Sequence, residues 1–257
     1  MDLKLKNIIL PRLVVLKTLV GSHNYLLNDK DSDRDYKLFI MPEFDDLYDN
    51  ALFTTPNIVT KELDYDIHDI RKLPRLAWKA NINYIEGLFS TDVESDFGVE
   101  LPYEIVELFK MNERIAHMNL PKFFDACIGT YNQKMLLLNT GTESTQELVA
   151  KFGYDTKQAC HAFRNLDILV RYAATDFESF EDALRYGTNV GFRDLVLDIK
   201  HGKLTRKEFL SVANTHKNTA EALKEKYKSQ PVDEECLKLM NDLVRQLVRK
   251  YIVECEQ

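Results

Sequence analysis

The sequence reads LVVLKTLVGS at residues 13–22 and SDRDYKLFIMP at residues 32–42. The first run is apolar and β-branched up to Gly21-Ser22, and the second becomes apolar after its aspartates and is closed by Pro42. Short apolar runs bounded by turn residues are typical of buried strands. The stretch therefore predicts a strand, a turn that opens into a short helix over 22–27, and a second strand over 36–41.

The turn at Gly21-Ser22 has the composition of a phosphate-binding turn. Gly21 lets the backbone approach a ligand closely because it carries no side chain. Ser22 offers a hydroxyl and an N–H at the expected start of a helix, where the backbone attracts anions. The alternative is an ordinary polar turn that binds no ligand.

Two aspartates, Asp33 and Asp35, stand at the start of the second expected strand. Alternate residues of a strand project to the same face, so the two carboxylates should lie side by side. Such a pair repels itself unless a cation lies between, and Mg²⁺ is typically held by one or two carboxylates together with substrate phosphates. The pattern suggests a metal next to a phosphate, with a solvated acidic turn as the alternative.

A third strand is expected over residues 58–68. Alternation places Asp64, Asp66 and His68 on one face and apolar side chains on the other. A two-metal transfer site usually needs a further acid, and alternation alone does not choose between Asp64 and Asp66. The alternative interpretation is an edge strand with one polar face.

Beyond Asp69, which suits a helix N-cap, the apolar period becomes that of helices. The expected helices cover residues 70–79, 84–89, 102–117, 121–138, 143–152, 156–174, 177–186, 192–199, 205–227 and 232–253. We therefore predict an α+β protein in which a small mixed β-sheet core, residues 1–100, precedes a large α-helical domain, residues 101–257.

Three basic or titratable residues share one face of the helix expected at 156–174. Lys157, His161 and Arg164 follow one another at i, i+4 and i+7. They form either a surface for an anionic ligand or an exposed face held by salt bridges. Glu86, between apolar neighbours, is either a buried functional acid or a residue at the edge of an apolar face.

Composition limits the class of protein. The chain has 257 residues, 45% of them hydrophobic, and a net charge of −7. That charge argues against a broad basic surface for nucleic acid, although a local basic strip remains compatible with it. The four cysteines lack the spacing of a zinc site or a disulfide framework, which indicates reduced thiols in a cytoplasmic setting. We expect no targeting or membrane-spanning segment.

Taken together, these residues resemble the DNA polymerase β superfamily of nucleotidyltransferases. The superfamily pattern is a Gly-Ser, an Asp-x-Asp on the next strand and an acid on a third strand. In this chain, Gly21-Ser22, Asp33, Asp35 and Asp64 fit that pattern, and the resemblance favours Asp64 over Asp66 as the third carboxylate.

The chain is more closely similar to an RNA-ligase-associated, or phage-type, subgroup of predicted nucleotidyltransferases. The residues that carry this similarity extend over nearly the whole chain. They are Tyr25, Ser32, Asp69-Ile70-Arg71-Lys72, Asn81 with Ile85-Glu86-Gly87-Leu88-Phe89, Tyr154-Asp155-Thr156-Lys157 with His161 and Arg164, and Ile199-Lys200-His201-Gly202-Lys203-Leu204 with Glu208-Phe209. The chain departs from the subgroup at Leu26 and Lys37-Leu38, where glycines are usual, and at Ile82, where proline is usual.

The resemblance implies a metal-dependent enzyme that moves an NMP from an NTP to an acceptor hydroxyl and releases pyrophosphate. Asp33, Asp35 and Asp64 would be catalytic and would bind two Mg²⁺ ions, with Mn²⁺ as the alternative ion. The nucleotide would contact seven residues. These are Gly21, Ser22, Tyr25, Ser32, Lys157, His161 and Arg164.

The acceptor implied is an RNA end, a protein hydroxyl or a small molecule, and the compartment implied is the cytoplasm of a bacterium or of a phage-infected host. No membrane partner is expected, and the sequence leaves the oligomeric state open. Two other interpretations stay open. The first is a binding or accessory protein that keeps the fold without turnover, which the missing glycines suggest, and the second is a metal-dependent phosphohydrolase.

Overall fold

The computed structural model describes residues 12–30, 32–55, 58–59, 63–98, 100–187 and 190–255, without the side chains of Val59, Val190 and residues 253–255. The chain divides into two compact units. Unit 1 is Met1–Met118 with Asp233–Gln257, and unit 2 is Asn119–Val232. This division differs from the expected boundary at residue 100, because the helices between residues 102 and 118 and the helix after residue 233 belong to the unit that holds the sheet.

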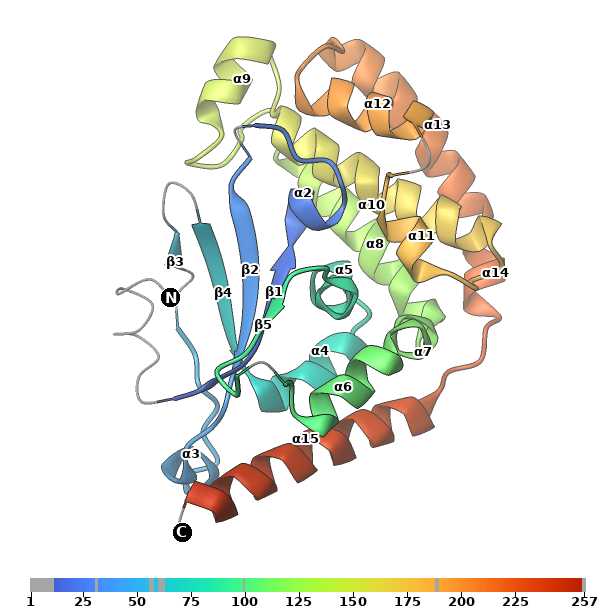
Figure 1. Ribbon diagram of the computed structural model, residues 1–257. Coiled ribbons are helices and arrows are strands. Elements are labelled where there is room, and N and C mark those ends of the chain that lie inside the picture. Colours follow the sequence, from blue (N-terminus) through green and yellow to red (C-terminus); the bar gives the residue numbers. More distant parts are fainter. Residues whose placement is uncertain are drawn as a thin grey trace. The chain divides into compact units, whose positions relative to one another are not determined.

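Unit 1 is built on a mixed sheet of five strands with the order β3-β4-β2-β1-β5 (Figure 1). The strands are β1 Val14–Val20, β2 Arg34–Ile40, β3 Ile58–Val59, β4 Leu63–Asp69 and β5 Val93–Glu94. β2 pairs parallel with β4, whereas the pairs β1–β2, β1–β5 and β3–β4 are antiparallel. The strand expected over 58–68 is present as β3 and β4, and residues 60–62 of it lie outside the described residues.

The two faces of this sheet differ as alternation predicts. Leu38 and Ile67 belong to an apolar cluster on one face, together with the aromatic pair Tyr36 and Tyr65. The opposite face carries the odd-numbered residues of β2 and the even-numbered residues of β4, among them the candidate carboxylates. The apolar cluster on one face therefore fixes the strands, and the candidate carboxylates project from the opposite face.

The remaining elements of unit 1 are helices and 3₁₀ turns. They are α2 Gly21–Asn24, α3 Phe44–Tyr48, η1 Ile70–Lys72, α4 Leu73–Trp78, α5 Ile82–Ile85, η2 Glu86–Phe89, α6 Tyr103–Lys110, α7 Asn112–His117 and α15 Glu234–Cys255. α15 packs against α4, α6, α7 and η1. α3 was not among the expected helices, and at its start the Asp46 carboxylate accepts a hydrogen bond from the Glu43 N–H.

Unit 2 is entirely helical in its described residues. Its helices are α8 Leu120–Leu136, α9 Gln146–Phe152, α10 Thr156–Ala174, α11 Phe180–Leu184, α12 Val190–Lys200, α13 Arg206–Ala222 and α14 Lys224–Lys228. α10 is the central helix, since it packs against α8, α9, α11, α12 and α13. The Asp155 side chain caps the start of α10, and Thr205 forms a capping box with Glu208 at the start of α13.

The expected α+β architecture, a small mixed sheet followed by a large helical region, is confirmed. No helix in the described ranges combines the length and the apolar composition needed to cross a lipid bilayer.

Candidate functional site

The Gly21-Ser22 turn lies directly against the second of the two aspartates. Gly21 has φ +70°, and a β-carbon built on it would come within 2.2 Å of the Asp35 Oδ2 atom. An L-residue is strained in this backbone region, and here it would also collide with the carboxylate. Position 21 therefore favours glycine because of its positive φ and because of the nearby Asp35 side chain, and the expected phosphate turn lies next to the expected metal ligand.

The strand register places a second carboxylate beside Asp35. β2 and β4 run parallel with Asp35 paired to Asp64, so the two side chains project from neighbouring strands on the same face. Asp33 lies two residues before Asp35 and is exposed, whereas Asp35 and Asp64 are half-buried. Among the residues that the structure describes, no three His, Cys, Asp or Glu side chains are grouped closely enough to hold a metal ion.

Asp66, the alternative third carboxylate, has cationic partners inside the protein. It forms an ion pair with Lys37, which is 4% exposed, and the His68 Nε2 atom lies 3.0 Å from its Oδ1. Burial by itself would raise the pKa of Asp66, but the hydrogen bond from His68 and the charge of Lys37 outweigh it and hold that pKa well below its usual value. Lys37 also lies over the Tyr84 ring, 4.6 Å from its centroid. Asp66 thus has its charge compensated by Lys37 within the protein and also contacts His68.

The buried acid that the sequence singled out, Glu86, holds the Gly21-Ser22 turn. Its Oε2 accepts a hydrogen bond of 3.0 Å from the Gly21 N–H, and its backbone oxygen accepts one of 3.1 Å from the Asn24 side chain. Glu86 and Asn24 are 3% and 1% exposed. The carboxylate therefore occupies the Gly21 donor, and the backbone oxygen of Glu86 holds the other end of α2 through Asn24. The sequence left open whether Glu86 is buried or lies at the edge of an apolar face, and it did not predict this partner.

Two further residues expected to bind nucleotide have visible structural contacts. Tyr25 is fully buried. The Ser32 hydroxyl donates to the Asp29 carboxylate at 2.8 Å and accepts from the Asp29 N–H at 3.0 Å, which closes the loop before β2. Ser32 thus shapes the loop before Asp33 and Asp35, and a direct contact of Tyr25 or Ser32 with nucleotide stays a prediction.

The backbone conformation at Leu26 shows how the chain accommodates leucine where the subgroup usually has glycine. Its φ is +63°, so this position uses the left-handed conformation that glycine adopts without strain. The side chain is 42% exposed. The turn therefore keeps a backbone suited to glycine while it carries leucine, and the leucine side chain is accommodated at the surface.

Unit 2 gathers positive charge around one histidine. Lys157 is exposed on α10, His161 is half-buried one turn later, and Arg164 is 6% exposed. Burial, followed by the charges of Arg164, Lys134, Lys157 and Lys200, holds the pKa of His161 well below its usual value. All four charged groups that act on this histidine are cations.

Two members of this basic cluster, Lys134 on α8 and Lys200 on α12, were missed by the sequence analysis. Their helices pack against α10, but nothing in the spacing along the chain connects them with His161. Burial and the charges of Arg164 and Lys157 lower the pKa of Lys134, against the opposing effect of Asp155. A neutral histidine among cations is a suitable environment for an anionic ligand.

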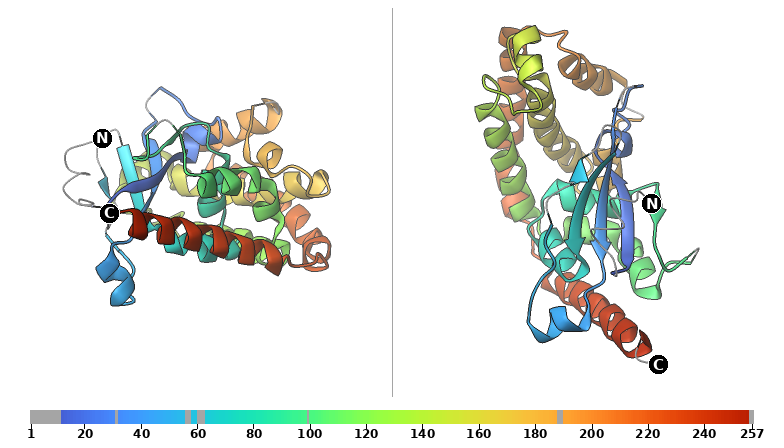
Figure 2. Two further views of the ribbon diagram at one scale, coloured as in Figure 1. Left: turned by 60° about the horizontal axis from the view of Figure 1, so that its bottom comes forward. Right: turned by 90° about the vertical axis from the view of Figure 1, so that its left-hand side faces the viewer.

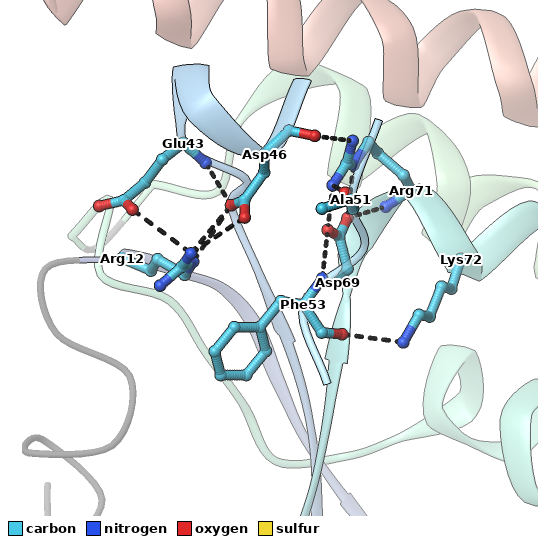
Figure 3. A network of polar contacts seen from close by, with 8 residues as sticks. All are labelled: Arg12, Glu43, Asp46, Ala51, Phe53, Asp69, Arg71 and Lys72. Atoms are coloured by element: carbon cyan, nitrogen blue, oxygen red, sulfur yellow. Dashed lines mark hydrogen bonds and ion pairs between the residues drawn. The ribbon is translucent and has the colours of Figure 1, made fainter. Parts of the chain in front are cut away.

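The Asp69-Ile70-Arg71-Lys72 stretch has a structural role in unit 1 (Figure 3). The fully buried Asp69 carboxylate caps η1 by accepting from the Arg71 N–H at 2.9 Å, and it binds the Arg71 guanidinium at 2.9 and 2.6 Å. The Arg71 guanidinium also donates a hydrogen bond to the backbone oxygen of Ala51 at 2.5 Å, and Lys72 donates one to the backbone oxygen of Phe53 at 2.8 Å. The cap predicted at Asp69 is confirmed, and the two cations tie the segment after α3 to the end of β4.

Comparison with known families agrees with this geometry. Residues 6–120 match the model of a family described as RlaP, RNA repair pathway DNA polymerase beta family. No curated protein matches the sequence significantly. The matched range contains the Gly21 turn and the three carboxylates Asp33, Asp35 and Asp64, and it ends before nearly all of unit 2. The resemblance to the DNA polymerase β superfamily is confirmed for this part of the chain.

Proposed function

We propose that this chain, similar over residues 6–120 to a DNA polymerase β family of RNA repair, is a metal-dependent nucleotidyltransferase that moves an NMP from an NTP to an acceptor hydroxyl. One observation carries the proposal above the others. The Asp35 carboxylate lies against Gly21 and stands in register with Asp64. A turn suited to phosphate and two carboxylates therefore meet where β2 and β4 begin and β1 ends.

The carboxylate oxygens at this end of the sheet are suitable ligands for a hard divalent cation. Carboxylate oxygens are the ligands that Mg²⁺ prefers, and Mg²⁺ usually combines one or two of them with substrate phosphates. Asp33, Asp35 and Asp64 would hold the proposed two ions, with Mn²⁺ as the alternative. When bound, such ions neutralise charge on the reacting phosphate oxygens.

Residues of the chain would position the nucleotide. The Gly21 N–H is engaged by Glu86, so the Ser22 hydroxyl and N–H are the proposed phosphate contacts of the turn. Lys157, His161 and Arg164, joined by Lys134 and Lys200, are proposed to contact phosphates of the nucleotide or of the acceptor.

The proposed chemistry is an in-line displacement at the α-phosphate. The acceptor oxygen forms a new bond to phosphorus, the bond from phosphorus to the bridging oxygen of the β-phosphate breaks, and pyrophosphate leaves with that electron pair. The proton of the acceptor hydroxyl passes to a carboxylate, for which we propose Asp64. Asp64 suits this role because, unlike Asp66, it stands in register with Asp35.

An RNA end is the proposed acceptor. The matched family is described as one of RNA repair, which supports an RNA substrate over a protein or small-molecule hydroxyl. The net charge of −7 makes a local contact with the RNA end more suitable than a grip on a long duplex.

Transfer of label from an α-labelled NTP tests the proposal. The full chain is incubated with Mg²⁺, each NTP in turn, and RNA, cell protein or small hydroxyl compounds. We expect labelled RNA, and we expect Asp33→Asn, Asp35→Asn and Asp64→Asn to abolish labelling while the fold survives. Asp49→Asn, an exposed carboxylate on the segment after α3, is the matched control and should label normally.

Unchanged labelling by Asp35→Asn would refute the assignment of the site. Label that appears only as free nucleotide, without acceptor, would indicate a phosphohydrolase. A comparison of Asp64→Asn with Asp66→Asn decides which residue is the third acid. Labelling is measured under conditions where both variants are folded, and only loss of the true ligand should then abolish it.

A binding protein without turnover is the second candidate, because the described carboxylates do not form a group of three around one point. A thermal-shift series distinguishes the two functions. A ligand of the native state stabilises it by mass action, so an enzyme with an intact site should show shifts that require both Mg²⁺ and NTP. No shift with any nucleotide would favour the binding protein.

A further inference from the structure

Helix α3 presents large apolar side chains to solvent. Phe44 and Tyr48 are 57% and 80% exposed, and their rings stack with centroids 6.3 Å apart. Leu47 and Leu52 are also exposed, and none of the residues of α3 is buried. Grouped exposed apolar residues on a soluble protein are a common mark of an interaction surface.

Ionic contacts hold this helix firmly in place (Figure 3). The Arg12 guanidinium binds the Asp46 carboxylate at 3.0 Å and lies 3.3 Å from the Glu43 carboxylate. Behind the helix, Arg71 donates to backbone oxygens of Asp46 and Ala51 while it is bound to buried Asp69. The helix that carries these aromatic side chains thus lies on a fixed support beyond the end of the sheet (Figure 2).

A pocket of about 470 Å³ lies directly beside α3, within unit 1. Val244, Val248 and Ile252 of α15 provide its apolar part, together with Leu47. Arg245 and Arg249 stand on the same helix at its exposed side. This volume is in the range of pockets that accept a ligand or a side-chain anchor. Among the described residues that line it there is no aspartate or glutamate.

The charges of the two neighbouring features are opposite. α3 and its C-cap carry the exposed carboxylates Asp45 and Asp49 beside the aromatic rings, whereas the pocket carries Arg245 and Arg249 beside aliphatic side chains. We propose that this face binds a second copy of the same chain, with α3 of each protomer inserted in the pocket of its partner. A twofold axis between α3 and the pocket generates both contacts at once, because an isologous interface matches each feature to its complement.

The expected anchors are Phe44 and Tyr48. Aromatic side chains supply much of the contact area of protein interfaces, and anchors of this kind sit in pockets lined by apolar residues. Asp45 and Asp49 would then face Arg245 and Arg249 of the partner at the rim, where complementary charge sets the register of the two chains.

Sedimentation velocity on the full chain, from about 1 to 100 μM, tests the association. These concentrations bracket the affinity of ordinary reversible dimers. We expect a concentration-dependent monomer–dimer equilibrium and, for Tyr48→Ser, a dissociation constant raised at least about 10-fold. Tyr48 is exposed, so at a concentration where both proteins are monomeric the variant should unfold at the temperature of the wild type. A monomer at every concentration, or a Tyr48→Ser protein that dimerises as the wild type does, would overturn the proposal.

A charge exchange tests the pairing itself. The double variants D45K/D49K and R245E/R249E should each weaken the dimer, and the protein that carries all four substitutions should recover it, because both sides have changed sign. Lys79→Glu, an exposed lysine outside the pocket, is the control and should dimerise normally. Failure of the fourfold variant to recover would exclude this arrangement. None of these measurements uses nucleotide, so they stand independently of the proposed transferase activity.

Discussion

The Asp35 carboxylate lies so close to the α-carbon of Gly21 that a β-carbon there would be 2.2 Å from Oδ2. The contact follows from the pairing of β1 with β2, which sets Val20 opposite Asp35 at the point where β1 passes into α2. A backbone turn and an acidic side chain that are distant along the chain are thereby locked together. Several experiments can measure how much the site depends on this and on neighbouring contacts.

Gly21→Ala should damage both stability and transfer. The left-handed backbone costs an L-residue about 1–2 kcal/mol, and the collision with Asp35 adds to it, so we expect a loss of about 3 kcal/mol in the free energy of unfolding. Gly98→Ala is the matched control, because Gly98 has φ +96° but nothing within 4 Å of a new β-carbon. It should lose about 1 kcal/mol and keep activity. Equal losses in urea denaturation of the two variants would contradict the role of the Asp35 contact.

Glu86→Ala should loosen the turn, whereas Glu86→Gln should retain it. Alanine leaves the Gly21 N–H without its acceptor at a cost of about 1–3 kcal/mol, while the glutamine oxygen can still accept that bond. We expect KM for the NTP to rise at least about 10-fold in the alanine variant, with most of kcat retained once nucleotide is saturating. Recovery of KM by glutamine separates a positioning role from a catalytic carboxylate, which glutamine would not replace.

Leu26→Gly should be tolerated although it removes a large side chain. Leu26 is in the left-handed region and 42% exposed, so relief of backbone strain offsets the lost contacts and the added freedom of the unfolded chain. We expect a change within about 1 kcal/mol. Its neighbour Leu27 is 2% exposed, and Leu27→Gly should cost about 3–5 kcal/mol. Thermal unfolding of both variants checks the contrast, and a similar loss in both would show that Leu26 is held by packing.

Asp66→Asn should change the dependence of stability on pH. The pKa of Asp66 is lowered in the folded protein, so its stabilisation is present above the ordinary value of 3.8 and is lost as pH falls through the lower folded-state pKa. The variant leaves buried Lys37 without its carboxylate, and we expect a loss of about 2–3 kcal/mol at pH 7. Urea denaturation from pH 3 to 7 should show this difference shrinking below pH 4. A difference that stays constant over the range would refute the ion pair.

His161 should report on the basic cluster of unit 2. Its pKa is held well below the usual value by burial and by the surrounding cations, so removal of one of them should raise it. NMR titration of the imidazole protons should show a higher pKa in Lys134→Met, and also when pyrophosphate is added to the wild type. Lys122→Met, on the same helix α8, is the control and should leave the titration unchanged. No response to pyrophosphate would argue against an anion at this cluster.

Local patterns along the chain were sufficient for much of the fold. The periodicity over residues 156–174 corresponds to α10, and the apolar run before Gly21 corresponds to β1. α3 was missed because Asp45-Asp46 has the composition of a turn, and its cap uses a glutamate backbone with an aspartate side chain. β5 is only two residues long and gives no periodic signal.

Tertiary pairing accounts for what the sequence alone left open at the site. Alternation put Asp64 and Asp66 on the same face but did not show that Asp64 is in register with Asp35 while Asp66 pairs with Lys37. Lys134 and Lys200 reach His161 from other helices, so helical spacing on α10 does not reveal them. For Glu86 the sequence left open a buried acid or the edge of an apolar face, because the partner that decides it lies 65 positions away in the chain.

Because α15 belongs to unit 1, this unit cannot finish folding until α15 has been synthesised. Unit 1 comprises the start of the chain and residues 233–257, with all of unit 2 encoded between them. During synthesis, the sheet that carries Asp35 emerges early, but the packing of α4 and α6 against α15 waits until residues 234–255 have left the ribosome. A chain that lacks α15 would therefore leave surfaces of α4 and α6 uncovered and available to chaperones and proteases, so the unit that carries the candidate site is completed only after unit 2 has been synthesised.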